Sequence, residues 1–412
     1  MLFIHLRQRS NGLFSECLEC WQRERDQYLD RANRLEDALY RGLPLPEDLV
    51  LVPGDALALV RAVDGYLRDR TTDLWEIGEI LTIGEHTVHV VARPFGHGAN
   101  LSARQPGELV WWLRYFWVMP VVHSLATVEV HASPAQLFRA FSPILEQRTL
   151  RIVVGGFLDA SAPDWETAPP SYGCSQLHNP DSRWRSVEHA LNRAREYDAQ
   201  VLVLPELTLC PALRARVACW LANNTHSLAL VVPGSYHVLD GGRRFNEAWL
   251  LGPRGKRLLT HRKLRAMLIV RNPTADNADT DDLDEVVEDI VEVPHLPMLM
   301  TPLGPLALAI CLDFCNQTMA PLWQAVGPSM VLVPSMSNDA TLRAHKRRAA
   351  DLAREHGTIS AIALQSPDED RLRCYGWVQS PNNHQPVLLE AADDDLCVRC
   401  ITVELPLPTT NF

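Results

Sequence analysis

Three side chains of different chemistry each follow an expected strand of the sequence. Glu206 comes after the apolar run 201–204 and a proline, Lys263 follows an expected hairpin, and Cys311 ends the apolar run 305–310. In α/β proteins, strand ends commonly carry the reactive groups. A thiol is a good nucleophile only once deprotonated, a carboxylate in an apolar pocket can accept and later return that proton, and an ammonium can stabilise an oxyanion. Together these residue types predict nucleophilic catalysis by a cysteine.

Lysine is scarce in this chain, which makes Lys263 informative. Lysine and arginine together number 39, and the only lysines are Lys256, Lys263 and Lys346. Arginine serves wherever a plain positive charge is enough, whereas the pKa of a lysine can be tuned by its surroundings. Chance explains the presence of most of the three lysines, but at position 263 the scarcity of lysine favours a chemical role over a surface charge.

Each of these residues also has a structural alternative. A buried cysteine is often an inert core residue, and Cys315 is a second thiol close by. Glu206 could instead interact with the start of the helix that follows it. We favour catalysis by Cys311 because it ends a strand beside Asp313, whereas Cys315 lies past the strand.

Apolar strands alternate with amphipathic helices from residue 149 onward. This order is typical of α/β domains, in which helices cover the faces of a sheet. Strands are expected at 150–157, 201–204, 228–232, 305–310, 330–333 and 358–364, with a hairpin joining 248–251 to 256–260 and helices at 182–198, 212–222 and 341–355. The acidic stretch 276–289, with eight carboxylates, is expected to be a solvated loop.

The first 148 residues have the pattern of a separate, small α+β domain. Helical periodicity covers 14–39, 55–68 and 133–147, and strands at 75–83 and 86–92 are expected to pair across a Gly-Glu turn. The aromatic stretch 111–117 is expected in a core, with a contact surface as the alternative. We therefore expect an N-terminal domain of residues 1–148, for interaction or regulation, and a second domain of residues 149–412.

The second domain resembles the nitrilase (carbon–nitrogen hydrolase) superfamily. The resemblance covers about residues 150–405, in the family's order. It rests on Val203-Leu204-Pro205-Glu206, on Asn246 through Gly255 into His261-Arg262-Lys263, on Gly304 through Ile310-Cys311-Leu312-Asp313, on Val331 to Ser335, on Arg348-Ala349 and on Gly376 to Leu389.

The resemblance implies a four-layer α-β-β-α sandwich and hydrolysis of a non-peptide carbon–nitrogen bond, most commonly an amide, through a thioester. Glu206 would be the general base, Lys263 the oxyanion-stabilising lysine and Cys311 the nucleophile, with the backbone N–H of Leu312 as a second oxyanion donor. The family needs no metal or organic cofactor, acts on small molecules and forms dimers or larger assemblies.

Two features depart from the family pattern. Members usually carry a second glutamate soon after the lysine, but residues 264–271 contain no carboxylate. Glu285 or Glu288, within the acidic stretch, is a candidate for that role, and Asp313 is a further accessory candidate. The other departure is the N-terminal domain, which the family core does not require and which could bind a protein partner.

Composition limits the other functions. The net charge of −11 argues against nucleic acid as a partner, and no run of about 20 apolar residues lacks a charge, which argues against a membrane span. Ten cysteines without an export signal predict a cytoplasmic protein with reduced thiols.

Two local patterns suggest other ligands. The pairs Cys17-x-x-Cys20 and Cys397-x-x-Cys400 have the spacing of zinc ligands, but the second lies in an expected strand, where residues three apart face opposite sides. The basic run 345–348 is expected to be a polar helix face with Arg348 turned inward rather than a nucleic-acid site.

Two further functional classes remain open. One is a catalytically idle scaffold or binding protein with this fold. The other is an accessory hydrolase of a larger system, for instance one of bacterial defence. An ammonia-release screen separates the first class from active enzymes.

Overall fold

The computed structural model describes thirteen segments of the chain. They are residues 25–41, 58, 61–62, 79–83, 86–92, 116–157, 163–168, 171–271, 284–337, 339–365, 374–381, 387–390 and 396–405. Helices and strands alternate through most of this length, so the chain is a mixed α/β protein, as the sequence predicts.

The first large sheet has seven strands and runs in the order β10-β11-β9-β8-β5-β21, with β12 paired to β11. Its central strands β5, β8 and β9 are parallel and almost wholly buried. Apolar runs of this kind suit strands that are covered on both faces. The strands are β5 (Thr149–Phe157), β8 (Val201–Val203), β9 (Leu230–Val232), β10 (Ser235–Asp240), β11 (Arg243–Leu251), β12 (Arg257–Arg262) and β21 (Leu396–Glu404).

The second large sheet also has seven strands, in the order β20-β19-β18-β17-β16-β15-β4. The buried strands β16, β17 and β18 are parallel and form its centre. Its strands are β4 (Thr127–His131), β15 (His295–Thr301), β16 (Gly304–Leu308), β17 (Met330–Met336), β18 (Ile359–Gln365), β19 (Cys374–Gln379) and β20 (Val387–Glu390).

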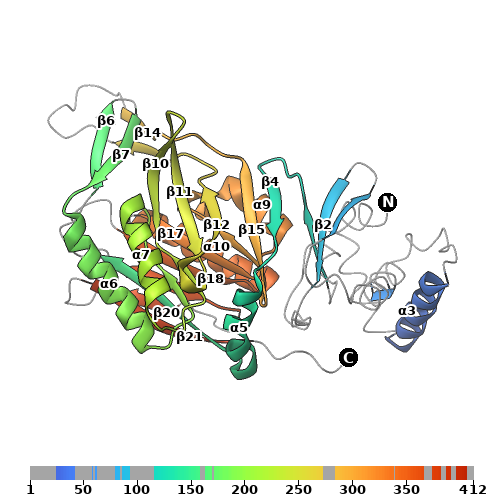
Figure 1. The fold of residues 1–412 in the computed structure, drawn as a ribbon. Helices are drawn as coiled ribbons and strands as arrows, with labels where there is room; N and C mark the ends of the chain where they lie inside the picture. The colour runs from blue at the N-terminus through green and yellow to red at the C-terminus, as the bar shows by residue number, and fades with distance from the viewer. Residues whose placement is uncertain are drawn as a thin grey trace.

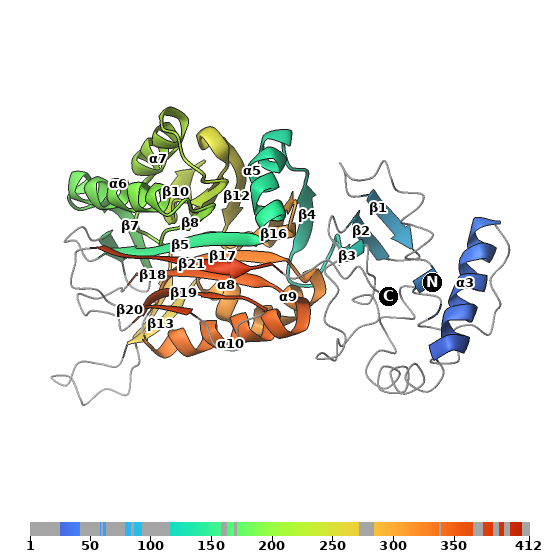
Figure 2. The same cartoon turned by 90° about the horizontal axis from the view of Figure 1, so that it is seen from below.

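The two large sheets face each other, and helices lie on their outer sides (Figure 2). The two sheets approach closely at Gly156 of β5, where a Cβ atom would lie 2.7 Å from the ring of Tyr375 on β19. The helices beside the first sheet are α5 (Ala135–Gln147), α6 (Pro180–Glu196) and α7 (Pro211–Asn223), and those beside the second are α8 (Leu312–Cys315), α9 (Ala320–Val326) and α10 (Asp339–His356).

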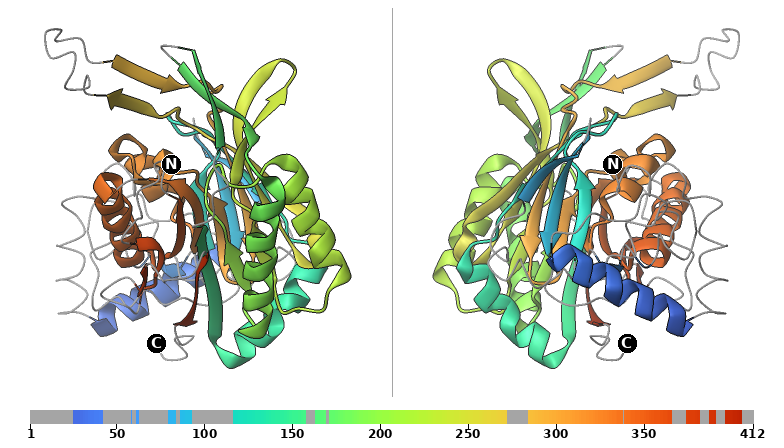
Figure 3. Two further views of the ribbon diagram at one scale, coloured as in Figure 1. Left: turned by 90° about the vertical axis from the view of Figure 1, so that its left-hand side faces the viewer. Right: turned by 90° about the vertical axis from the view of Figure 1, so that its right-hand side faces the viewer.

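A smaller four-stranded sheet stands at one end of the two large sheets (Figures 1 and 3). Its strands are β6 (Pro163–Ala168), β7 (Ser171–Leu177), β13 (Leu268–Arg271) and β14 (Asp284–Glu288), in the order β13-β14-β7-β6. The expectation of a solvated loop over 276–289 is therefore wrong for 284–288, which form β14 and end in the buried Glu288. Residues 276–283 lie outside the described residues.

The N-terminal part contains helix α3 (Arg25–Tyr40) and a three-stranded sheet of β1 (Glu79–Ile83), β2 (His86–Ala92) and β3 (Phe116–Pro120). The predicted pairing of 75–83 with 86–92 is confirmed over residues 79–83, and 75–78 lie outside the described residues. Trp117 of β3 is buried in the main core, as expected for the aromatic stretch. Residues 14–24, most of 55–68, and 111–115 lie outside the described residues.

The core begins before the boundary predicted at residue 148. Strand β4 pairs in parallel with β15 in the second large sheet, and Leu137, Phe141 and Ile144 of α5 are buried in the main core. Helix α5 was expected from the sequence, but β4 joins a strand about 170 residues later in the chain, and no local pattern signals such a pairing. The N-terminal domain thus cannot extend to residue 148.

Candidate active site

Glu206, Lys263 and Cys311 each stand just past a strand, and the structure brings all three to one place between the two large sheets. Glu206 follows β8, Lys263 follows β12 and Cys311 follows β16. All three side chains are buried, with at most 2% of each residue exposed. Cys311 has a positive φ of 47° at the turn from β16 into α8. A non-glycine residue held in such a conformation is costly and is common at functional sites.

The ammonium of Lys263 lies between two buried carboxylates. Its Nζ donates to Oε1 of Glu206 at 2.9 Å and to Oε2 of Glu288 at 2.7 Å. Ion pairs this well buried are stable only where geometry and further hydrogen bonds satisfy every charge. Here the side-chain amide of Asn246 also donates to both carboxylates, at 2.8 Å to Glu206 and 2.9 Å to Glu288.

The second carboxylate at Lys263 is that of Glu288, which belongs to the four-stranded sheet and not to the loop after Lys263. The backbone N–H of Met267 also donates to its Oε2, at 3.0 Å. Glu285, the other candidate, lies three residues earlier in β14, where its backbone pairs with that of Val270. Of the two residues that the sequence left open, Glu288 is the one that reaches Lys263.

His237 holds Glu288 from the other side. The backbone N–H of Cys174 donates to Nδ1 of His237 at 2.9 Å, so the proton is on Nε2, which donates to Oε1 of Glu288 at 2.9 Å. His237 and Asn246 face each other across the β10–β11 pair. Neither was predicted as a site residue.

The buried charges in this cluster keep one another ionised. Burial alone would lower the pKa of Lys263, but the adjacent Glu206 and Glu288 raise it well above its ordinary value. Burial alone would raise the pKa of Glu288, but Lys263 and His237 hold it well below the ordinary range. Lys263 is therefore an ammonium and Glu288 a carboxylate throughout the physiological pH range.

The thiol of Cys311 lies in a neutral pocket next to this cluster. Its Sγ is 3.5 Å from the carbonyl oxygen of Met336 and 3.7 Å from Oγ of Ser337. The backbone N–H of the same Met336 donates to Oε2 of Glu206 at 2.8 Å, so one residue connects the thiol to the carboxylate. Burial, and then the charge of Glu206, raise the pKa of the Cys311 thiol far above its ordinary value.

Asp313 links the loop after Lys263 to the turn after Cys311. Its carboxylate accepts from the backbone N–H groups of Leu264 and Arg265, at 3.0 and 3.1 Å, and from Nε2 of His261 at 3.0 Å. Asp313 is fully buried and makes no contact with Glu206 or Glu288 that would mark it as an acid or base. It positions the lysine relative to the thiol.

The remaining predicted residues have distinct positions. Leu312 opens α8, so its N–H is one of the helix-start donors that have no partner within the helix. Cys315 ends the same short helix, buried, and burial raises the pKa of its thiol to about 12. Arg348 is turned inward as expected, and its Nε donates to the carbonyl of Phe314.

Sequence reasoning missed three more residues beside the site. Tyr172 of β7 is buried close enough to Glu288 and Lys263 for their charges to act on it, and burial is the main cause of its raised pKa. Ser337 and His345 lie behind Cys311. The sequence predicts His345 to be part of a basic helix face, whereas in the structure it is fully buried.

Two negative findings apply to the described residues. No group of three or more His, Cys, Asp and Glu side chains among them is arranged to hold a metal ion, and no helix among them is long and apolar enough to cross a membrane.

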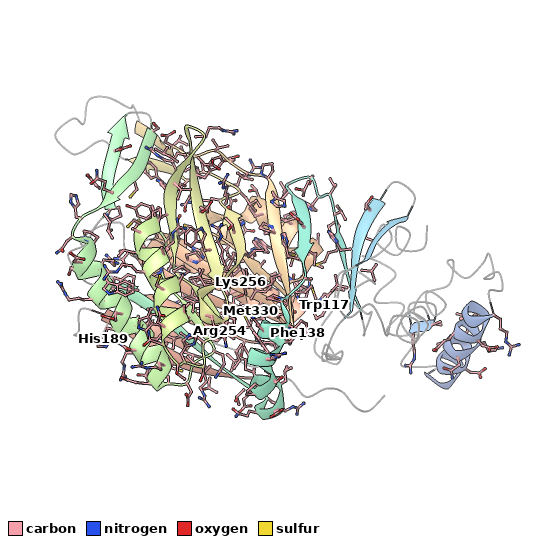
Figure 4. The ribbon with its side chains drawn as sticks, viewed as in Figure 1. Trp117, Phe138, His189, Arg254, Lys256 and Met330 are labelled. Carbon is pink, nitrogen blue, oxygen red and sulfur yellow. The ribbon has the colours of Figure 1, made fainter. Side chains whose placement is uncertain are left out.

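A surface hollow of about 640 Å³ lies between α5, the end of α7 and the β11–β12 turn, and contains none of the site residues. The turn carries Arg254 and Lys256 (Figure 4), at the opposite end of β12 from Lys263.

Comparison with known proteins finds similarity only among solved structures. No protein-family model matches the sequence, and no curated protein sequence matches it. The similar structures include an amidase from Nesterenkonia sp., with 19% identity over 62% of this chain and 90% of that one, at a TM-score of 0.43. A variant of the Nesterenkonia AN1 amidase, described as from the nitrilase superfamily, has 20% identity over 63% and 91%, also at 0.43.

A further variant of that amidase carries the acetamide moiety of fluoroacetamide on its active-site cysteine; its identity is 18% over 62% and 90%, at a TM-score of 0.43. These values describe a partial overlap of folds. The function of this chain therefore has to be argued from its own site.

Proposed function

We propose that this protein hydrolyses a non-peptide carbon–nitrogen bond, most commonly that of a carboxamide, through a thioester on Cys311. The observation that carries the proposal is the buried ammonium of Lys263 between Glu206 and Glu288, with Glu206 connected to Cys311 through Met336. Burying three charges is unfavourable without a compensating use, and this set contains the base, the cation and the nucleophile that amide hydrolysis by a cysteine requires.

In the first half of the reaction, Glu206 takes the proton of the Cys311 thiol as the sulfur attacks the carbonyl carbon. The carbonyl oxygen becomes an oxyanion, which the Lys263 ammonium and the backbone N–H of Leu312 stabilise. The protonated Glu206 then gives its proton to the leaving nitrogen, the carbon–nitrogen bond breaks, and ammonia or an amine departs. The acyl group remains as a thioester.

In the second half, water attacks the thioester carbon. Glu206 accepts a proton from that water, and the same two donors stabilise the second oxyanion. The carbon–sulfur bond breaks, the sulfur regains a proton from Glu206, and the carboxylic acid product leaves as its carboxylate. Atoms and charges balance with one amide and one water consumed, and no metal or organic cofactor takes part.

Glu288 and Asn246 act on Lys263 rather than on the substrate. Two neighbouring carboxylates keep the lysine protonated despite its burial, so the ammonium is available at every step. A neutral lysine would be a much weaker oxyanion partner.

The burial of the site supports a small-molecule substrate. Cys311 has no exposed surface and Lys263 only 2%, so a folded protein cannot present a side chain to the sulfur. We further propose that the two sheets and their outer helices form the four-layer α-β-β-α architecture of nitrilases, preceded by a small α+β domain, and that the protein acts in the cytoplasm as a dimer or larger assembly.

The alternative of an idle scaffold fits the site less well. A binding protein has no need of three buried charges, because an apolar core of the same volume is usually as stable.

An ammonia-release screen tests the proposal. The wild-type protein is assayed with aliphatic and aromatic amides, nitriles and N-carbamoyl compounds, beside Cys311→Ala and the matched control Cys315→Ala. We expect release from at least one amide by the wild type and by Cys315→Ala, and none by Cys311→Ala. Full activity of Cys311→Ala, or no turnover of any compound by the wild type, would overturn it.

A further inference from the structure

A chain of uncharged polar groups runs from helix α10 to the sulfur of Cys311. Nε2 of His345 lies 3.2 Å from Oγ of Ser335 and 3.4 Å from Oγ of Ser337. The two serine oxygens are 2.7 Å apart, and Ser337 Oγ is 3.7 Å from Cys311 Sγ. All four residues are buried, and the resemblance to nitrilases assigns no role to the two serines or the histidine.

We infer that His345 is a positioning residue, which directs the hydroxyl of Ser337 onto the Cys311 sulfur so that the thiolate receives a neutral hydrogen-bond donor. The inference rests on the proposed use of Cys311 as the nucleophile. It adds a third component to the site, beside the base and the lysine.

The direction of the chain follows from the position of one proton. Nδ1 of His345 is buried and has no hydrogen-bond partner among the described residues. A buried N–H without an acceptor is more costly than a buried acceptor without a donor, so the proton of the neutral ring is on Nε2. Nε2–H then donates to a serine oxygen.

Once the histidine donates into the serine pair, the hydroxyl hydrogens must point away from it. The Ser335 hydroxyl donates to Ser337 Oγ at 2.7 Å, and the remaining acceptor for the Ser337 hydroxyl is the Cys311 sulfur. The thiol hydrogen has its own acceptor, the Met336 carbonyl oxygen. The sulfur therefore accepts a hydrogen bond both before and after its proton leaves.

The surroundings keep His345 a neutral donor. Its ring stacks on Phe314, with centroids 6.0 Å apart, and meets the edge of Trp377 at 6.1 Å. Burial lowers the pKa of His345 to about 3, so it carries no charge at physiological pH and is not an alternative general base.

The donor matters because burial and the charge of Glu206 oppose the thiolate, while the Lys263 ammonium and a hydrogen bond from a serine hydroxyl act in its favour. Burial and the Glu206 carboxylate both raise the pKa of Cys311. A single hydrogen bond to a charged group changes a pKa by about one unit. Without Ser337, the thiol would thus be harder to ionise by about that much.

The test measures the reactivity of the sulfur itself, independently of any substrate. Alkylation of Cys311 by iodoacetamide is followed by mass spectrometry across a pH series, in a Cys315→Ala background so that only one thiol of the segment reacts. Ser337→Ala should move the alkylation profile to higher pH by about one unit and slow the reaction at neutral pH about threefold or more, because higher intrinsic nucleophilicity offsets part of the lost thiolate. The matched control is Ser360→Ala, because Ser360 is a buried serine of β18 that does not belong to this series of hydrogen bonds.

Two substitutions of the histidine separate positioning from packing. Gln places an amide N–H near the position of Nε2, whereas Asn reaches only the position of Nδ1. We expect His345→Gln to keep the wild-type profile and His345→Asn to follow Ser337→Ala, with both proteins folded by circular dichroism.

Wild-type alkylation profiles in both Ser337→Ala and His345→Asn would overturn the inference. The result is separable from the proposed function, because a protein that alkylates as expected but releases no ammonia from any amide retains the hydrogen-bond chain and loses the enzymatic assignment.

Discussion

Both halves of the site are buried, but one half consists of charged groups and the other of neutral groups. One half, Glu206, Lys263 and Glu288, is fully charged, and each charge is compensated by its neighbour. The other half, Cys311 with Ser337 and His345, has only neutral groups, and the pKa of its thiol is raised. Because two carboxylates share one ammonium, the charged half has an excess negative charge that opposes a thiolate next to it. The thiol is therefore expected to stay protonated until a substrate carbonyl is in place.

Glu206→Gln should have the largest effect within the charged half. The amide keeps the shape of the side chain but cannot accept the thiol proton, so turnover should fall about 10³-fold, within the range for loss of a general base. The control is Glu247→Gln, because Glu247 neighbours Asn246 in β11 and pairs with Arg262 away from the site. The measurement is kcat on the amide found in the screen, and near-normal kcat in Glu206→Gln would mean that another group takes the proton.

Lys263→Arg keeps the charge but replaces a compact ammonium with a larger planar group. Loss of an oxyanion donor lowers rates about 10²–10³-fold, and we expect a decrease of that size in kcat because the guanidinium cannot occupy the same position. Lys256→Arg is the matched control, since Lys256 is exposed at the turn of the same hairpin (Figure 4). Equal activity of the two variants would refute the argument from the scarcity of lysine.

The charged half and Cys311 were largely predictable from sequence, whereas the other residues of the neutral half, Ser337 and His345, were not. Glu206 and Cys311 follow apolar strands and Lys263 follows the second strand of a hairpin, which are patterns that can be recognised locally in the sequence. For the second carboxylate the sequence leaves two candidates, Glu285 and Glu288. The choice depends on a strand pairing between β14 and β7 that has no local signal.

A local sequence signal does indicate that residues 237 and 246 lie opposite each other. The turn Gly241-Gly242, with φ of 57° and 75°, is typical of a tight hairpin. That turn fixes the register of β10 and β11 and places residues 237 and 246 opposite each other.

His345 had no usable signal, because a histidine beside Lys346 and Arg347 looks like part of a polar face. Only the packing of α10 against Phe314 and Trp377 shows that it is buried. The boundary at residue 148 failed for the same kind of reason, since β4 adds to a strand far along the chain.

Glu288→Gln tests the difference in charge between the two halves, because it removes the excess negative charge and leaves the general base, Glu206, in place. The pKa of Lys263 should fall, since Glu288 is one of the two carboxylates that raise it, and the alkaline limit of kcat/KM should move to lower pH. We expect about a tenfold lower kcat at neutral pH from weaker positioning of the lysine. Glu285→Gln, three residues earlier in β14, is the control; an identical response of the two variants would contradict the assignment of Glu288.

The smallest effect concerns stability, and its sign follows from the lowered pKa of Glu288. In the unfolded chain this carboxyl takes up a proton as the pH falls through its ordinary pKa of about 4.3, whereas in the folded protein, where Lys263 and His237 lower the pKa, it stays ionised well below that. The stabilisation is therefore present above the ordinary pKa and is lost as the pH falls. Urea unfolding from about pH 6 to about pH 3 should show a steeper loss of unfolding free energy in the wild type than in Glu288→Gln. A difference between the two that stays constant or widens as the pH falls would show that the charge of Glu288 does not stabilise the fold, and that its ion pair with Lys263 is retained for catalysis alone.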